Sequence, residues 1–289
     1  SRRRQQQKKQ PSYFNLPTIF MFDLHAQAAA AVRASKKLAL LSTEVKNAVL
    51  TKIALALLAR SDEILAANQE DVERAKAAAS SCDDVMLDRL LLTTDRIRAM
   101  AHDIETVIAL PDPVGEMIDE RTRPNGLTIQ RVRVPLGVVG MIYESRPNVT
   151  VDAAVLCLKS GNAVMLKGGS DAISTNRVLV KIMKKAISQA MDHDAGEYDA
   201  DGEALAEALQ FIDSTDRAVT AEFLKLKGFL DVIIPRGGKG LIDFVMQNAT
   251  VPVIGTGASV VHTYVDEAAD FDMAIGIAVN AKIRRVSIC

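Results

Sequence analysis

The first part of the chain is dominated by apolar side chains that recur every three or four residues. Residues 23–110 are rich in Ala and Leu at this spacing, which predicts three or four consecutive amphipathic helices. Ser42, Ser61 and Thr94 stand where helices are expected to begin, because hydroxyl oxygens can accept hydrogen bonds from first-turn amides. Residues 111–115, which contain two prolines and a glycine, end the last helix.

A β-hairpin is predicted around Asn125-Gly126. This dipeptide favours a two-residue type I′ turn, which needs positive φ at both positions, and the alternating segments 116–123 and 127–134 supply its strands. The hairpin has many polar side chains and little apolar surface. Two arrangements remain open: an arm that projects and pairs with another subunit, or a ribbon packed at the sheet edge of its own domain.

After Pro135 the pattern alternates between strands and helices. Residues 138–143 form a continuous apolar run, typical of a strand buried on both faces of a parallel sheet. The next helix is expected to end before Gly161, a natural C′ glycine. Further strands are predicted over residues 163–166, 210–213 and 230–235. This alternation predicts an α/β fold, a doubly wound parallel sheet whose ligands bind at the carboxyl ends of the strands.

Composition and charge narrow the class of protein. The 289 residues are 48% hydrophobic and 25% charged, which is enough for one large domain or two smaller ones. No apolar run approaches the roughly 18 to 20 residues of a membrane-spanning helix, so no membrane association is expected. The first ten residues hold five basic side chains and no acid, and residues 1–22 are predicted to be a disordered leader.

The remaining charges are unfavourable for nucleic-acid binding. Without those five basic residues, 30 basic side chains stand against 36 acidic ones, a net charge of −6. The three cysteines are widely spaced, with no CxxC pair and no Cys/His cluster, so neither a disulfide framework nor a metal site is expected. A reducing, cytoplasmic setting fits this pattern best.

Two glycine-rich turns follow predicted strands and mark the candidate binding site. They are Lys167-Gly168-Gly169 and Arg236-Gly237-Gly238. Glycine lets a backbone approach a ligand closely, and the amides of a following helix favour an anion such as a pyrophosphate. Taken singly, the Arg236-Gly237-Gly238 segment is explained equally well as a tight strand-to-helix turn. Lys167 taken singly is equally well explained as a solvated lysine in a turn. Two such turns at one sheet edge make a nucleotide site the better hypothesis.

Four runs of the sequence carry a resemblance to a known family. They are residues 134–150, which include Glu144-Ser-Arg-Pro-Asn148, and residues 160–169, 234–238 and 279–282. The runs resemble the γ-glutamyl phosphate reductase family of the aldehyde dehydrogenase superfamily. The resemblance covers residues 24–289, and the Glu144-Ser-Arg-Pro-Asn148 run is specific to this family within the superfamily.

The resemblance implies an activity and a set of site residues. The expected reaction is NADPH-dependent reduction of L-glutamyl 5-phosphate to L-glutamate 5-semialdehyde with release of phosphate, a step of proline biosynthesis. Cys289 falls on the catalytic nucleophile and Asn148 on an oxyanion-stabilising asparagine. The two glycine turns fall on positions that contact NADPH/NADP, and the hairpin falls on an arm that forms a homo-oligomer.

The chemistry of an acyl phosphate suits these residue types. A thiolate attacks an acyl phosphate well, and nearby cations lower the pKa of a thiol. Lys282 and Arg285 lie just before Cys289, and together with Arg146 they are candidates for binding the anionic substrate.

This interpretation divides the chain into five parts. They are a leader over residues 1–22, helices of the cofactor domain over 23–115, the hairpin arm over 116–134, the nucleotide-binding sheet over 135–252 and the start of an incomplete catalytic domain over 253–289.

The sequence departs from the family next to Cys289. Ile283, Val286 and Ile288 stand where the family has Thr, Pro and Thr, and nothing follows the cysteine. A terminal carboxylate beside the thiol would raise its pKa. The activity of this chain is therefore left open, and the alternative is an inactive relative that binds only nucleotide or partner subunits.

Overall fold

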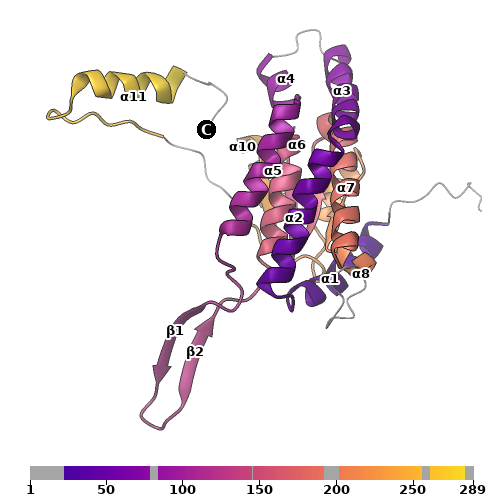
Figure 1. Cartoon of the computed structure of the whole chain (residues 1–289), viewed down its shortest axis with the longest axis vertical. Coiled ribbons are helices and arrows are strands. Elements are labelled where there is room, and N and C mark those ends of the chain that lie inside the picture. The colour runs from indigo at the N-terminus through magenta and orange to yellow at the C-terminus, as the bar shows by residue number, and fades with distance from the viewer. Residues whose placement is uncertain (1–22, 79–83, 145, 192–201, 256–260, 284–289) are drawn as a thin grey trace, which may run out of the picture.

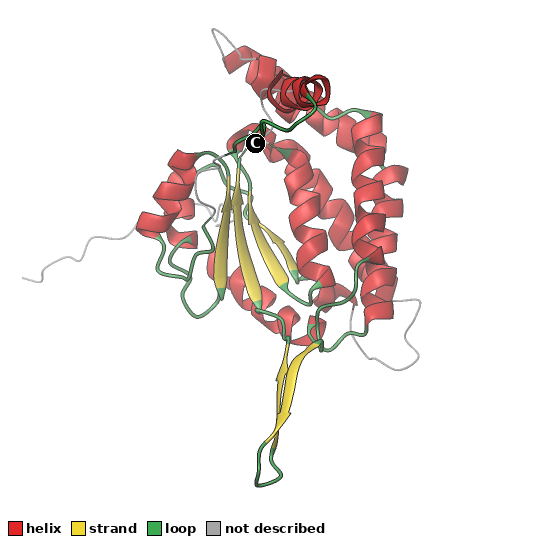
Figure 2. Ribbon diagram, turned by 90° about the vertical axis from the view of Figure 1, so that its left-hand side faces the viewer, coloured by secondary structure: helices red, strands yellow, loops and turns green. Residues whose placement is uncertain are grey.

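The structure is a computed structural model that describes residues 23–78, 84–144, 146–191, 202–255 and 261–283. These residues form a helical bundle, a four-stranded sheet and a separate two-stranded hairpin (Figures 1 and 2). The leader expected over residues 1–22, and Arg285 and Cys289, lie outside the described residues.

The N-terminal helices begin close to the predicted positions. Ser42 was correctly identified as a cap, because its hydroxyl oxygen accepts a hydrogen bond of 3.4 Å from the Val45 amide. The cap predicted at Thr94 is Thr93, whose hydroxyl oxygen accepts from the Arg96 amide at 3.2 Å. The helices are α1 (Leu24–Leu38), α2 (Thr43–Ala59), α3 (Ser61–Ala78), α4 (Asp84–Leu90) and α5 (Thr94–Ala109).

The predicted parallel α/β sheet is confirmed. Its strands lie in the order β5-β4-β3-β6, every pair is parallel, and helices lie on both faces of the sheet (Figure 2). The strands are β3 (Val138–Tyr143), β4 (Ala163–Lys167), β5 (Leu209–Phe211) and β6 (Val232–Arg236). The connecting segments are α6 (Pro147–Lys159), the 3₁₀ turn η1 (Ser170–Ala172), α7 (Ile173–Met191), α8 (Gly202–Ala206), α9 (Arg217–Phe223) and α10 (Lys239–Asn248).

The N-terminal helices form a second layer over the sheet. Helices α2, α3 and α5 pack against α6 and α7, and these two helices contact the strands. Asp71 of α3 is fully buried and accepts hydrogen bonds from the Thr175 amide, at 2.8 Å, and from the Thr175 hydroxyl, at 2.7 Å. This carboxylate therefore caps the first turn of α7 from a neighbouring helix.

The hairpin projects from the body of the protein (Figures 1 and 2). Strands β1 (Met117–Thr122) and β2 (Thr128–Val132) are antiparallel, and every residue in them is exposed. They pair only with each other within the described part of the chain. The arrangement with a ribbon packed at its own sheet edge is therefore wrong. The projection of the arm is confirmed, and its pairing with another subunit stays a prediction.

The predicted type I′ turn at the tip is wrong. The Gly126 amide donates to the Arg123 carbonyl at 2.9 Å, and the Arg123 amide donates to the Leu127 carbonyl at 2.8 Å. Gly126 has a φ of 86°, whereas Asn125 is not among the positive-φ residues. Pro124 explains the difference, since its ring fixes φ near about −65° and so gives a three-residue loop closed by a left-handed glycine.

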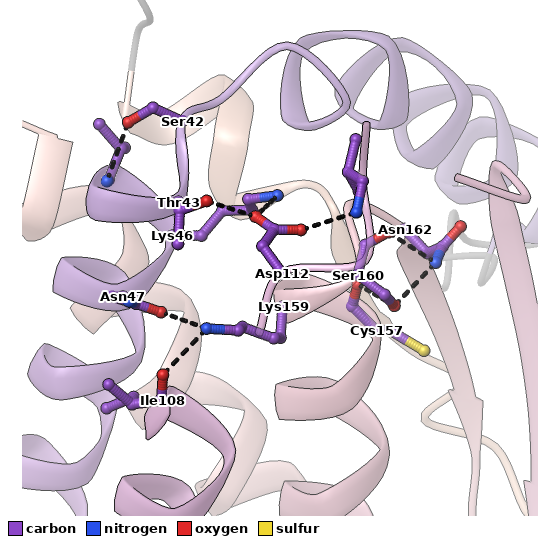
Figure 3. Close-up of polar contacts among 12 residues, drawn as sticks. Ser42, Thr43, Lys46, Asn47, Ile108, Asp112, Cys157, Lys159, Ser160 and Asn162 are labelled. Carbon is purple, nitrogen blue, oxygen red and sulfur yellow. Dashed lines mark hydrogen bonds and ion pairs between the residues drawn. The ribbon is translucent and has the colours of Figure 1, made fainter. Parts of the chain in front are cut away.

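A buried polar network fixes the base of the arm (Figure 3). Lys46 forms an ion pair with Asp112, whose side chain is 8% exposed and also accepts from the Thr43 hydroxyl at 2.9 Å. Lys159 of α6, only 4% exposed, donates to the Asn47 side chain at 2.7 Å and to the Ile108 carbonyl at 3.0 Å. The network joins α2, α6 and the segment that leads from α5 into the arm.

The helix in the C-terminal part of the described residues is not buried against the rest of the protein. Helix α11 (Phe271–Ile283) has no buried residue and lies apart from the bundle (Figure 1). Across the described residues, no helix combines the length and the apolar composition that crossing a membrane would require.

We predict that Asp112→Ala lowers the free energy of unfolding by about 3–5 kcal/mol, because it leaves the buried Lys46 ammonium without its counter-ion. Urea denaturation measures the loss. Asp119→Ala, which breaks an exposed ion pair with Arg131 on the arm, is the control and should cost about 0–1 kcal/mol. Equal losses in the two variants would contradict the assignment of a buried charge network.

Candidate nucleotide site

The strand order identifies the place where a ligand is expected. From β3 the chain moves to β4 and β5 on one side, whereas β6 pairs with β3 on the other side. The direction of winding thus reverses between β3 and β6. In open α/β sheets the crevice at the carboxyl ends of such strands is the usual binding site.

The glycine turn after β6 lies at this switch point. The register pairs Tyr143 with Arg236, so that Gly237 and Gly238 follow directly beside the end of β3. Gly238 is the N-cap residue of α10, and its amide donates a hydrogen bond of 2.9 Å to the Glu144 carboxylate. A Cβ at Gly237 would lie 2.6 Å from Glu144 Cδ, so a side chain there would displace the Glu144 carboxylate from this position.

The glycine turn after β4 lies on the other side of β3. Gly168 is packed against two side chains, because an added Cβ would lie 2.4 Å from Asn176 Nδ2 and 3.2 Å from the Tyr143 ring. Gly169 is half-buried and precedes the 3₁₀ turn η1 as its N-cap residue. Both turns therefore depend on glycine at positions where a side chain would intrude.

Lys167 is not the solvated turn lysine of the simpler interpretation. The residue is 7% exposed, and its ammonium donates to the Gly168 carbonyl at 3.0 Å. Burial lowers the pKa of this ammonium from its ordinary value. A buried cation with one neutral acceptor is well suited to binding a hydroxyl or a phosphate at the strand end.

A buried chain of hydroxyl and amide groups lies behind this turn. The Tyr143 hydroxyl is 2.6 Å from the Thr150 hydroxyl, which donates to Asn176 Oδ1 at 2.7 Å. Asn176 is 1% exposed, and its Nδ2 atom has no hydrogen-bond partner among the residues that the structure describes. The chain of hydrogen bonds links β3, α6 and α7 directly beneath Gly168.

Asn148 lies in the first turn of α6, beside the end of β3. Its side chain is exposed, and its amide donates to the Asp152 carboxylate at 3.3 Å, one helical turn on. Arg146 is exposed at the N-cap position of the same helix, and Arg236 is exposed at the end of β6. The structure thus brings Asn148, Arg146 and both glycine turns to the carboxyl edge of one sheet.

Asp152 is an acid with an unusual environment. Burial raises the pKa of this carboxyl from its ordinary value of 3.8 to about 6. The Asp103 carboxylate adds to the rise, whereas the Asn148 hydrogen bond and the Arg236 charge oppose it.

Lys282, the predicted residue of the C-terminal segment that lies within the described residues, is not brought to the sheet. Lys282 is exposed in the last turn of α11, which lies apart from the bundle (Figure 1). Among the described cysteines, Cys157 packs against the core, and burial raises its thiol pKa to about 12, which is unsuited to a nucleophile. No group of three or more His, Cys, Asp and Glu side chains in the described residues is arranged to hold a metal ion.

Sequence reasoning missed Glu144, Asp152 and Asn176. Glu144 directly follows a predicted strand, the same rule that identified Lys167, and Asp152 lies four residues after Asn148 on one helix face. These two had a signal in the sequence. Asn176 had none, because its significance depends on its packing against Gly168.

The chain is similar to known enzymes over nearly its whole length. The profile of the aldehyde dehydrogenase family matches residues 16–284. A γ-glutamyl phosphate reductase from Halalkalibacterium halodurans is 49% identical over 269 residues, which is 93% of this chain and 62% of the relative. The chain therefore spans about three-fifths of the length of that relative.

Solved structures agree with this similarity. A γ-glutamyl phosphate reductase from Thermotoga maritima has a TM-score of 0.81 at 43% identity, covering 91% of this chain and 60% of that one. The reductase from Saccharomyces cerevisiae has a TM-score of 0.71 at 32% identity, covering 90% and 62%.

We predict that Asp152→Asn makes stability less dependent on pH. A carboxyl whose pKa is raised by folding holds its proton more tightly in the folded state, so the wild type loses stability as the pH rises from 3.8 to about 6. The variant has no carboxyl at this position and lacks this loss. Its stability relative to the wild type should therefore increase as the pH rises across that interval. Thermal midpoints measured at several pH values test this.

Asp103→Asn serves as the companion variant. Without the Asp103 charge the Asp152 pKa should fall, and the same loss of stability should occur over a narrower and lower pH interval. Identical pH profiles for the wild type and Asp152→Asn would contradict the assignment.

Proposed function

The chain belongs to the aldehyde dehydrogenase family, and on that basis we propose that it reduces L-glutamyl 5-phosphate to L-glutamate 5-semialdehyde with NADPH, releasing phosphate. This is a reaction of proline biosynthesis. The observation that supports the proposal most is the pair of glycine turns after β4 and β6, the two strands that flank β3 at the switch point of the sheet. The relatives that are named as γ-glutamyl phosphate reductases supply the substrate class.

The residues of the site fit a nicotinamide dinucleotide. Gly168 and Gly237 lack side chains where a Cβ would meet neighbouring side chains, so both turns pack closely at the strand ends. The N-terminus of α10 favours a pyrophosphate, and the buried Lys167 ammonium suits a ribose hydroxyl or a phosphate. When bound, the cofactor would supply the hydride that converts an acyl group to an aldehyde.

The proposed chemistry begins at Cys289. Its thiolate attacks the acyl carbon, a carbon–sulfur bond forms, the bond to the phosphate oxygen breaks, and phosphate leaves. Asn148 would donate a hydrogen bond to the oxyanion that develops, and Arg146, Lys282 and Arg285 are the candidates for holding the anionic substrate. A free thiol agrees with a reducing compartment, the cytoplasm.

We predict that NADPH raises the thermal midpoint of the protein, because a ligand that binds only the folded state stabilises it, by about 2.7 kcal/mol at a hundredfold excess over Kd. Gly238→Leu should abolish this shift. A Cβ there meets nothing closer than 3.8 Å, so the fold tolerates the change, but the longer side chain covers the α10 N-terminus.

Gly276→Leu on α11, where a Cβ meets nothing within 4 Å, is the matched control and should keep the shift. The same protein is assayed for oxidation of NADPH with L-glutamyl 5-phosphate, with Cys289→Ala as the inactive control. Binding without turnover would favour the alternative of a nucleotide-binding relative, and no binding at all would defeat the proposal.

The projecting arm forms part of the proposal. Its two strands are fully exposed, and apolar side chains such as Met117, Leu127 and Val132 are 50%, 58% and 41% exposed. Unpaired strand edges of this kind are templates for pairing with another chain. A second copy of this chain is the proposed partner, so that the protein is a homo-oligomer.

We predict that replacing residues 117–132 with a short Gly/Ser linker shifts the protein to monomers in sedimentation velocity. The helical bundle and sheet should keep their thermal midpoint, because the arm pairs with no other described strand. A monomeric wild type, or an unchanged oligomer after the replacement, would refute the role of the arm.

A further inference from the structure

The anion-binding end of α10 has an internal ligand. The Gly238 amide donates to Glu144 Oε2 at 2.9 Å, and the Glu144 side chain lies over Gly237 so closely that a Cβ there would meet Glu144 Cγ at 2.9 Å and Cδ at 2.6 Å. The contact joins two residues 94 positions apart in sequence. It is therefore a tertiary contact between the ends of β3 and β6 and not a local helix cap.

The carboxylate lies where a phosphate would bind. Three features meet at this place: the switch point of the sheet, the first amide of α10 and the glycine that leaves room for close approach. A carboxylate and a pyrophosphate are both anions that accept hydrogen bonds from such amides. They cannot occupy the same donor together, and their charges repel at short range.

The contacts of Glu144 allow its side chain to move away from Gly238 while its backbone stays in place. Glu144 is exposed, and its carboxylate has no cation among the ion pairs found in the described residues. Its backbone is anchored instead, since its amide donates to the Arg236 carbonyl at 3.3 Å. The side chain can therefore rotate away from Gly238 without loss of the strand pairing.

We infer that Glu144 is a built-in competitor of the cofactor: its carboxylate occupies the pyrophosphate position of the free protein and is displaced when NADPH binds. This inference rests on the proposed function. Displacement costs part of the binding free energy, so Glu144 sets the affinity for the dinucleotide below what the glycine turn and the α10 N-terminus would otherwise give.

The test compares Glu144→Gln with the wild type. Gln keeps the size of the side chain but removes the charge, so NADPH should bind about three- to tenfold more tightly, as expected when an exposed charge-assisted hydrogen bond is weakened. Titration calorimetry with NADPH, and separately with inorganic pyrophosphate, measures Kd. Glu144→Ala, which removes the contact entirely, should also bind both probes more tightly.

Asp243→Asn is the matched control. Asp243 is exposed on α10 itself, about one turn beyond the N-terminus, and has the same charge without the contact to Gly238. Its replacement should change either Kd by less than twofold, roughly, because Asp243 does not contact the Gly238 amide and an exposed charge interacts only weakly through water. An equal gain in Asp243→Asn and Glu144→Gln would show a general charge effect and overturn the inference.

The outcomes separate this inference from the proposed function. If the wild type binds NADPH and Glu144→Gln binds it no more tightly, the inference that Glu144 competes with the cofactor is refuted, and the proposed function stands. Weaker binding by Glu144→Gln would make Glu144 a direct contact of the cofactor and would also refute it. If the wild type binds no NADPH, the proposed function fails. The pyrophosphate titration then decides whether Glu144 occupies an anion site: tighter binding by Glu144→Gln supports this, and unchanged binding refutes it.

Discussion

The architecture depends on the burial of strand β3 on both of its faces. All six residues of β3 are buried, and the strand pairs with β4 on one side and β6 on the other. Gly140 at its centre is so closely packed that an added Cβ would lie 3.0 Å from both Leu230 and Phe223 side chains. Because β3 is fixed from every side, the residues that follow it, from Glu144 into α6, start from a rigid point.

That constraint explains which features could be predicted from sequence. A continuous apolar run identifies a doubly buried strand, and glycine turns after strands identify the ligand edge, so the fold class and the two turns were accessible. The tip of the arm was predicted with the wrong turn type, because the strong local preference of Asn125-Gly126 was weighed without Pro124 before it. Local rules fail where a neighbouring residue restricts the same torsion angles.

Other features could not be predicted, because they arise only when distant segments meet. Lys46 and Asp112 are a buried pair separated in sequence by the three helices α3, α4 and α5, and no local pattern distinguishes them from solvated charges. Lys167 was open to a solvated interpretation for the same reason. Glu144 was visible as the residue after a strand, but its contact with Gly238 requires knowing that β6 lies beside β3.

The electrostatics of the sheet edge follow from this arrangement. Lys167 is a buried cation with a neutral acceptor, Asp152 is a half-buried acid with a raised pKa, and Glu144 lies on a helix N-terminus. Burial acts on Lys167 and Asp152, and the field of aligned amides acts on the Glu144 carboxylate. A protein that needed only a stable sheet edge would gain by replacing them with paired or apolar groups. Their presence at one edge, around the switch point, is the physical argument for our proposal that this edge binds an anion.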